Sequence, residues 1–79
     1  MEHYIATFHT HLSALRTSRS LTEAGIPAKM APVPRKLSSS CGTCVRYEAP
    51  EPCLGRMDRD VECVYREDGG DFICVHRGE

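Results

Sequence analysis

Residues 3–34 have the sequence HYIATFHTHLSALRTSRSLTEAGIPAKMAPVP, and this stretch decides the fold. Its start, His3–Phe8, is aromatic and β-branched and puts every second residue on one face, which predicts a first strand. Thr10 can cap a helix, and an apolar stripe with helical spacing then runs over His11–Ala24. Gly25 favours the left-handed conformation that ends helices, and the Ile-Pro pair after it prevents continuation.

Three more strands and a second helix are predicted after this helix. Ala28–Pro34 predicts a strand at a sheet edge, because its two prolines lack an N–H. A strand, helix and strand of these lengths predict a right-handed unit with the two strands parallel. A serine triplet ahead of Cys41–Glu48 can cap a short second helix. Gly69-Gly70 predicts a tight turn between strands at Val61–Arg66 and Asp71–Arg77.

The element order β-α-β-α-β-β predicts an α/β two-layer sandwich, with one mixed four-stranded sheet and two helices on one of its faces. Pairing across the glycine turn sorts the last two strands into two faces. The face without acidic residues or arginine is the expected core side. It carries Val61, Cys63, Tyr65, Phe72, Cys74 and His76. We therefore expect Cys63 and Cys74 to be buried as small apolar residues rather than joined as a disulfide.

Length and composition limit the remaining possibilities. The chain has 79 residues, which predicts a single domain over 1–79, and 10 basic residues balance 11 acidic ones. That balance argues against a nucleic-acid partner, which requires a basic surface. The longest apolar runs are too short for a membrane-spanning helix or a signal peptide, so we expect no membrane partner. Five cysteines without an export signal indicate a reducing cytoplasm.

The predicted chemistry centres on Cys41 and Cys44. A cysteine is a nucleophile only as thiolate, which is scarce at neutral pH for an ordinary thiol. Cys41 would lie in the first turn of the predicted second helix, where unpaired N–H groups favour negative charge. Preceding basic residues would add to that effect, and Cys44 would be near enough to act as a resolving thiol. The residues predicted to activate Cys41, or to leave room beside it, are Arg35, Lys36, Ser39, Ser40 and Gly42.

Zinc is the main rival chemistry. A zinc ribbon needs a second Cys-x-x-Cys pair about 15–20 residues after the first, but the three later cysteines are widely spaced and unpaired in sequence. We therefore expect no metal site. His3, His9 and His11 are more typical of a polar strand end than of metal ligands. Two other classes stay open: a folded interaction module, zinc-stabilised or not, and a thioredoxin-like dithiol redox protein, for which the chain is short.

The run VPRKLSSSCG at 33–42 resembles the hallmark of the selenium/sulfur carrier protein-like family of small bacterial domains. The resemblance extends over most of the chain, through YIATF at 4–8, AL at 14–15, EAGIPA at 23–28 and VE and VYR within 61–66.

This resemblance implies a cysteine that carries sulfane sulfur or selenium as a persulfide or perselenide, a role that maps onto Cys41 alone. The other four cysteines are not characteristic of the family pattern. Cys44, if it takes part, would attack Cys41 and release the reduced chalcogen. We expect a carrier protein rather than a free-standing enzyme. Its partners would be donor and acceptor proteins of sulfur or selenium metabolism, and it would need no cofactor besides the covalently carried atom.

Overall fold

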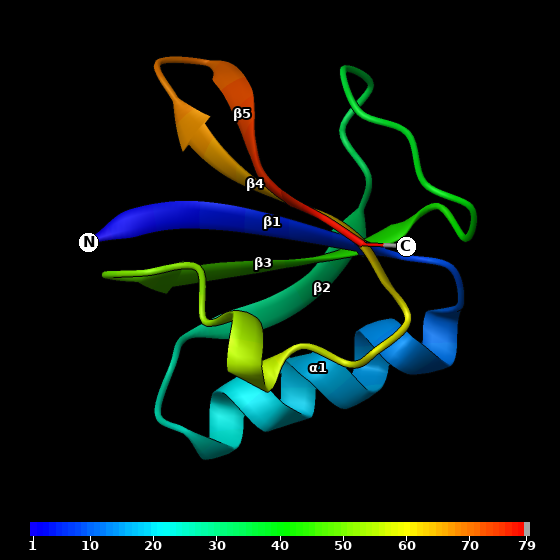
Figure 1. Ribbon diagram of the computed structural model, residues 1–79, viewed down its shortest axis with the longest axis vertical. Coiled ribbons are helices and arrows are strands. Elements are labelled where there is room, and N and C mark those ends of the chain that lie inside the picture. Colours follow the sequence, from blue (N-terminus) through cyan, green and yellow to red (C-terminus); the bar gives the residue numbers. More distant parts are fainter. Residues whose placement is uncertain (79) are drawn as a thin grey trace.

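The computed structural model describes residues 1–78; Glu79, the last residue of the predicted domain, lies outside the described residues. Residues 1–78 form one five-stranded sheet and one α-helix, which covers one face of the sheet (Figure 1). The elements are β1 (Glu2–Phe8), α1 (His11–Glu23), β2 (Ala28–Pro32), β3 (Thr43–Ala49), a 3-10 turn η1 (Leu54–Arg56), β4 (Val61–Asp68) and β5 (Asp71–Arg77). The strand order is β2-β3-β1-β4-β5, and every neighbouring pair is antiparallel. No helix in this range has the length and apolar character needed to cross a membrane.

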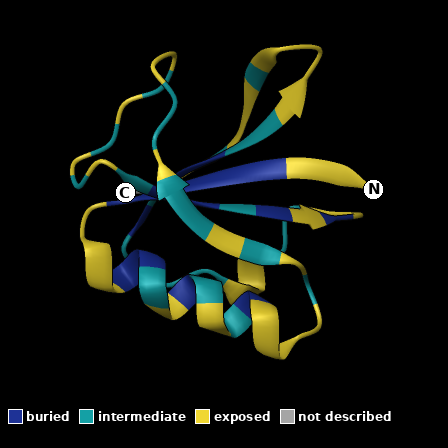
Figure 2. Cartoon of the chain, turned by 180° about the vertical axis from the view of Figure 1, so that it is seen from behind, coloured by how far each residue is buried: buried dark blue, intermediate teal, exposed yellow. Residues whose placement is uncertain are grey.

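The hydrophobic core lies between α1 and the sheet. Tyr4, Ala6 and Phe8 of β1 belong to it and are at most 4% exposed, which confirms the face predicted from their alternation. The ring of Tyr4 stacks on that of Tyr47 in β3, with centroids 5.3 Å apart. Figure 2 shows the buried middle of the sheet and the exposed outer side of the helix. The other members of this core are Ala14, Leu21, Val45, Ala49, Val61 and Val64.

Both ends of α1 follow the local chemistry of the sequence. Thr10 is the N-cap, and its hydroxyl oxygen accepts a hydrogen bond from the backbone N–H of Ser13 at 3.2 Å. At the other end Gly25 has a φ of +80°, a conformation that costs glycine little. The backbone N–H of Ile26 donates to the Leu21 carbonyl at 2.9 Å and closes the last turn. The predicted first helix is therefore confirmed.

The predicted second helix over Cys41–Glu48 is wrong, and so is the mixed four-stranded sheet with two helices. Most of these residues form β3, which lies between β1 and β2. Val45 and Tyr47 alternate into the core beneath α1, and both edges of β3 pair with neighbouring strands. Pairing on two edges outweighs a possible serine cap. Because β1 and β2 are each antiparallel to β3, they run in the same direction but do not touch as neighbours.

The hairpin of β4 and β5 forms at the predicted turn, where Gly69 and Gly70 have φ values of +57° and +90°. The predicted faces of this hairpin are partly wrong. Cys63 is buried, but it pairs with Thr7, which alternates with the core residues of β1 and so faces away from α1. Cys74 is exposed: it pairs with Tyr65, which pairs with Ile5, so it too is on the face away from α1, and it lies on the edge strand β5.

Candidate functional site

Cys41 lies in the connection between β2 and β3, residues 33–42, which we call the Cys41 loop. This loop rises on the side of the sheet away from α1 (Figure 1). Its two ends are held together by a hydrogen bond from the backbone N–H of Val33 to the Gly42 carbonyl at 3.1 Å. Gly42 has a φ of +73°, so the backbone itself needs a glycine at this position. The loop is thus closed at its base and presents Cys41 just before β3.

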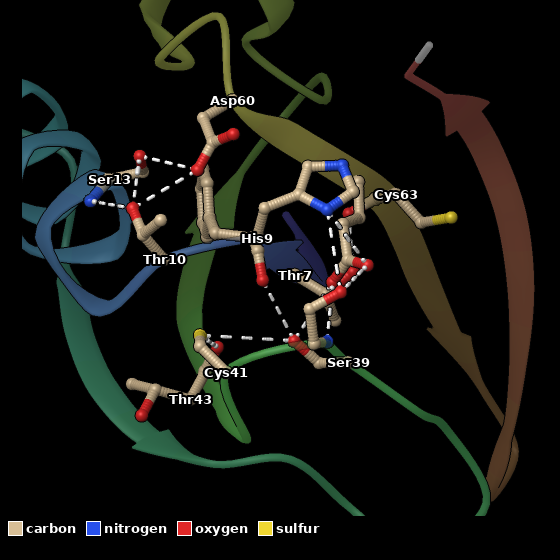
Figure 3. A network of polar contacts seen from close by, with 12 residues as sticks. Thr7, His9, Thr10, Ser13, Ser39, Cys41, Thr43, Asp60 and Cys63 are labelled. Atoms are coloured by element: carbon tan, nitrogen blue, oxygen red, sulfur yellow. Dashed lines mark hydrogen bonds and ion pairs between the residues drawn. The ribbon is translucent and has the colours of Figure 1, made fainter.

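The half-buried Cys41 side chain contacts two polar groups. Its thiol donates to the Thr43 carbonyl oxygen at 3.4 Å, and its sulfur lies 4.0 Å from the Ser39 hydroxyl oxygen (Figure 3). The Thr43 hydroxyl in turn lies 3.4 Å from Nδ1 of His11, the first residue of α1. Thr43, the first residue of β3, therefore contacts both the Cys41 sulfur and the start of α1.

A carboxylate from β4 holds the loop in place. Oε1 of Glu62 accepts hydrogen bonds from the Ser39 hydroxyl at 3.0 Å and from the Ser40 backbone N–H at 3.1 Å. Its Oε2 accepts from the Ser40 hydroxyl at 2.8 Å. The register between β1 and β4 shifts between Thr7 and Phe8, so that Glu62 is an extra residue in β4. Such bulges re-aim a side chain, and this one turns Glu62 toward the loop.

The surroundings of Glu62 favour its ionised form. Its side chain is 20% exposed, and this burial on its own raises the pKa. Hydrogen bonds from the side chain and backbone of Ser40 and from Ser39, together with the charge of His9, outweigh burial and lower the pKa of Glu62 below its ordinary value. Nδ1 of His9 lies 3.4 Å from Glu62 Oε2 and 3.4 Å from the Ser40 hydroxyl. A fixed negative charge therefore lies behind the two serines.

A second carboxylate fixes the start of α1 next to the site. Oδ2 of Asp60 accepts hydrogen bonds from the hydroxyls of Ser13 at 2.7 Å and Thr10 at 3.1 Å (Figure 3). The Ser13 hydrogen bond is the main cause that lowers the pKa of Asp60; desolvation opposes it and Thr10 adds to it. The backbone N–H of His9 donates to the Asp60 carbonyl at 3.3 Å. These contacts join the end of β1 and the start of α1 to the residue before β4.

Of the predicted site residues, Ser39 contacts the Cys41 sulfur; Ser40 and Gly42 are its neighbours along the chain, and the Ser40 hydroxyl contacts Glu62. The serines are hydrogen-bond donors to Glu62 and not helix caps, because no helix begins at Cys41. The helix terminus that was expected to favour a Cys41 thiolate is therefore absent at this place in the chain. The helix end that does lie near the loop is the start of α1.

The two predicted basic residues do not join the site. Nζ of Lys36 donates to the Gly70 carbonyl at 2.8 Å and forms an ion pair with Asp71 at 3.2 Å, both at the hairpin turn. Arg35 is exposed, and its side chain takes part in none of the hydrogen bonds or ion pairs found among residues 1–78. Their role in activating Cys41 stays a prediction, and none of these contacts supports it.

Cys44 is completely buried in β3. Its thiol donates to the Pro32 carbonyl at 3.6 Å. Burial raises the pKa of the Cys44 thiol; Arg46 lowers it and a negative charge on Cys41 raises it further. A buried thiol with a raised pKa is a poor nucleophile. The resolving role of Cys44 stays a prediction, and its burial counts against that role and against a thioredoxin-like dithiol mechanism.

Sequence reasoning missed Glu62 and His9. Alternation placed Glu62 on the outer face of the hairpin, whereas the bulge directs it to the Cys41 loop. One signal was available, because the apolar residues Val61 and Val64 are three positions apart and both belong to the core, a spacing that an unbroken alternating strand does not allow. His9 was noted only as part of a polar strand end. Its place beside Glu62 depends on the pairing of β1 with β4, which sequence spacing does not show.

The described residues offer no candidate metal site. Among residues 1–78, no group of three or more His, Cys, Asp or Glu side chains is arranged to hold a metal ion.

Comparison with known proteins agrees with the sequence resemblance. A family model described as "Putative Se/S carrier protein-like" matches residues 3–54, a range that includes the Cys41 loop. The chain belongs to this family. It is also similar to YtiA of Escherichia coli K12, a protein described as uncharacterized, with 25% identity over 77 residues that cover 95% of this chain and 91% of YtiA. No solved structure matches the chain. Glu62 lies outside the range that the Se/S carrier-like family model matches.

Proposed function

We propose that the protein is a carrier that accepts one sulfur or selenium atom on Cys41 and passes it to an acceptor protein. The observation that carries this proposal is the position of Cys41. It is a half-buried thiol in a loop closed at its base and held by Glu62, whereas Cys44 and Cys63 are buried within the sheet. The family description supports the same chemistry. A carrier thiol must stay reduced, so the proposal places the protein in the cytoplasm.

The transfer is an exchange between sulfur atoms. The Cys41 thiol loses its proton to water, and the thiolate attacks the outer sulfur of a donor protein's persulfide, R–S–S–H. A new S–S bond forms to Cys41, the old S–S bond breaks, and the electron pair of the old bond leaves with the donor sulfur, which takes up a proton. One S–S bond replaces another, so nothing is oxidised or reduced overall. The acceptor thiol repeats the step on loaded Cys41, and a perselenide follows the same balance.

The test is loading of the purified protein by a cysteine desulfurase and its cysteine substrate, read by intact-protein mass spectrometry. The wild type should gain the mass of one sulfur atom, and a reductant should remove it. Cys41→Ser should not gain this mass. Cys74→Ser is the matched control, because it removes an exposed thiol outside the site and should load like the wild type.

Two results would refute the proposal. The first is equal loading of the Cys41→Ser variant, which would show that another cysteine accepts the atom. The second is loading of the wild type that proteolytic mapping assigns to Cys53 or Cys74.

A further inference from the structure

The Ser39 hydroxyl has more acceptors around it than hydrogens to give. It lies 3.0 Å from the Phe8 carbonyl oxygen, 3.0 Å from Oε1 of Glu62 and 4.0 Å from the Cys41 sulfur. A serine hydroxyl carries a single hydrogen and two lone pairs. Its hydrogen can therefore point to an oxygen or to the sulfur, and the direction can change without movement of the loop.

Glu62 does not depend on Ser39 for its hydrogen bonds. Ser40 supplies it with two others, from the backbone N–H at 3.1 Å and from the hydroxyl at 2.8 Å. If the Ser39 hydrogen turns toward Cys41, each carboxylate oxygen keeps a donor. The partly buried carboxylate is then not left unpaired, which would otherwise oppose the change.

The two states of Cys41 call for different partners. As a thiol, Cys41 donates its own hydrogen to the Thr43 carbonyl, and Ser39 is free to donate to an oxygen. As a thiolate, the sulfur can only accept, and hydrogen bonds to charged groups are stronger than neutral ones. Among residues 1–78, the side-chain hydroxyl placed to donate a hydrogen bond to this sulfur is that of Ser39, whose oxygen lies 4.0 Å away.

We propose that Glu62 is a positioning residue for Cys41: it holds the Ser39–Ser40 segment so that the Ser39 hydroxyl donates a hydrogen bond to the Cys41 sulfur whenever that sulfur is negatively charged. This inference deepens the proposed function and rests on it for its biological meaning. The charged and titratable groups that face Glu62 come from three elements. These groups are His9, which directly follows β1, Arg77 of β5 and Cys63 of β4. Together with Glu62 they line a shallow cavity of about 210 Å³.

The test compares two adjacent serines. Both Ser39 and Ser40 donate to Glu62, but only Ser39 lies beside the sulfur, so Ser39→Ala and Ser40→Ala form a matched pair. The measured quantity is the rate of Cys41 alkylation by iodoacetamide at neutral pH, followed by peptide mass spectrometry. Alkylation of the exposed Cys74 in the same sample controls for the reagent.

Ser39→Ala should slow alkylation of Cys41 about threefold. A lost hydrogen bond to the thiolate lowers its population about tenfold, and the greater nucleophilicity of the remaining thiolate recovers roughly half of that effect on a logarithmic scale. Ser40→Ala should leave the rate close to the wild type, since the Ser40 backbone N–H still holds Glu62. Glu62→Ala should slow alkylation about as much as Ser39→Ala does.

A double-mutant cycle shows whether Glu62 acts through Ser39. The Ser39→Ala, Glu62→Ala variant should react no more slowly than either single variant, because the same hydrogen bond is lost in all three. Additive slowing would overturn the proposal, and so would equal slowing by Ser39→Ala and Ser40→Ala or an unchanged rate in Ser39→Ala. Thermal unfolding of each variant identifies any that is simply unfolded, and Ser39→Thr, which keeps a hydroxyl donor, should react faster than Ser39→Ala.

The outcome is separable from that of the carrier proposal, because alkylation needs no donor protein. A wild type that the desulfurase cannot load, with the predicted alkylation rates intact, would refute the carrier function but keep the positioning role. Normal loading with equal alkylation rates in the two serine variants would keep the carrier function but refute the positioning role.

Discussion

Replacing Cys44 by alanine separates its packing role from its predicted resolving role. The Cys44 side chain is fully buried in β3, where its residue pairs with Thr7 on one side and Ala31 on the other. Removing the sulfur leaves a small cavity on the face of the sheet away from α1. The loss corresponds to a one-methyl truncation in a core, about 1 kcal/mol of unfolding free energy.

That free energy converts directly into a melting temperature. An unfolding entropy of about 2.1 cal/mol/K per residue gives roughly 0.17 kcal/mol/K for 79 residues, so Cys44→Ala should melt about 6 °C below the wild type. Circular dichroism measures the shift. Cys74→Ala is the control, and its exposed side chain should leave the melting temperature unchanged.

The second readout is the lifetime of sulfur-loaded Cys41. If Cys44 only packs, Cys44→Ala and the wild type should lose the atom equally slowly in the absence of an acceptor. A loaded form that lives several times longer in Cys44→Ala, with an unchanged melting temperature, would refute this reasoning. It would show that the thiol leaves its buried position and attacks Cys41.

Three further predictions concern the loop, the acid dependence and the hairpin contact. Gly42→Ala should lower the unfolding free energy by about 1 kcal/mol in urea denaturation because Gly42 has a φ of +73°, whereas Gly55→Ala, with ordinary φ and open space around it, should not. The pKa of Asp60 is lower in the folded chain than in the unfolded one, so its contribution to stability is complete above the ordinary carboxyl pKa of about 4 and is lost as the pH falls through the folded value. Asp60→Asn should therefore reduce the loss of stability at acid pH in a curve of unfolding free energy against pH. An unchanged loss would contradict this prediction. Lys36→Ala should leave both the melting temperature and the rate of Cys41 alkylation nearly unchanged, since the Lys36–Asp71 ion pair is mostly exposed. A large drop in the alkylation rate would instead support the activating role of Lys36 that the sequence predicted.

Local chemistry was sufficient to predict the first half of the fold. The apolar alternation of β1, the Thr10 cap and the glycine after α1 each act within a few residues, and all three are found in the structure. The glycine turn of the hairpin belongs to the same class, because a positive φ at Gly69 and Gly70 is a local requirement.

The failures share a different cause. The segment at 43–49 follows serines suited to a helix cap, but it also has alternating Thr, Val and Tyr residues suited to a strand. Its conformation is decided by two neighbouring strands that are distant in sequence. The same holds for the site: Cys41 and its serines were found as a motif, but Glu62 joins them only through a bulge in the pairing of β1 with β4. Sequence spacing indicated the candidate thiol, Cys41, but not Glu62, whose carboxylate accepts the hydrogen bonds of its loop.

The central place of β1 has a consequence for motion. Its backbone is hydrogen-bonded to β3 on one side and β4 on the other. Its last residue, Phe8, and His9 directly after it contact the Cys41 loop. Local opening should therefore need far more free energy for β1 than for the loop. In native-state hydrogen exchange, the amides of residues 4–7 should be among the last to exchange, while those of residues 35–38 exchange early. The thiol would then be presented by a segment that opens often, anchored to the part of the molecule that opens least.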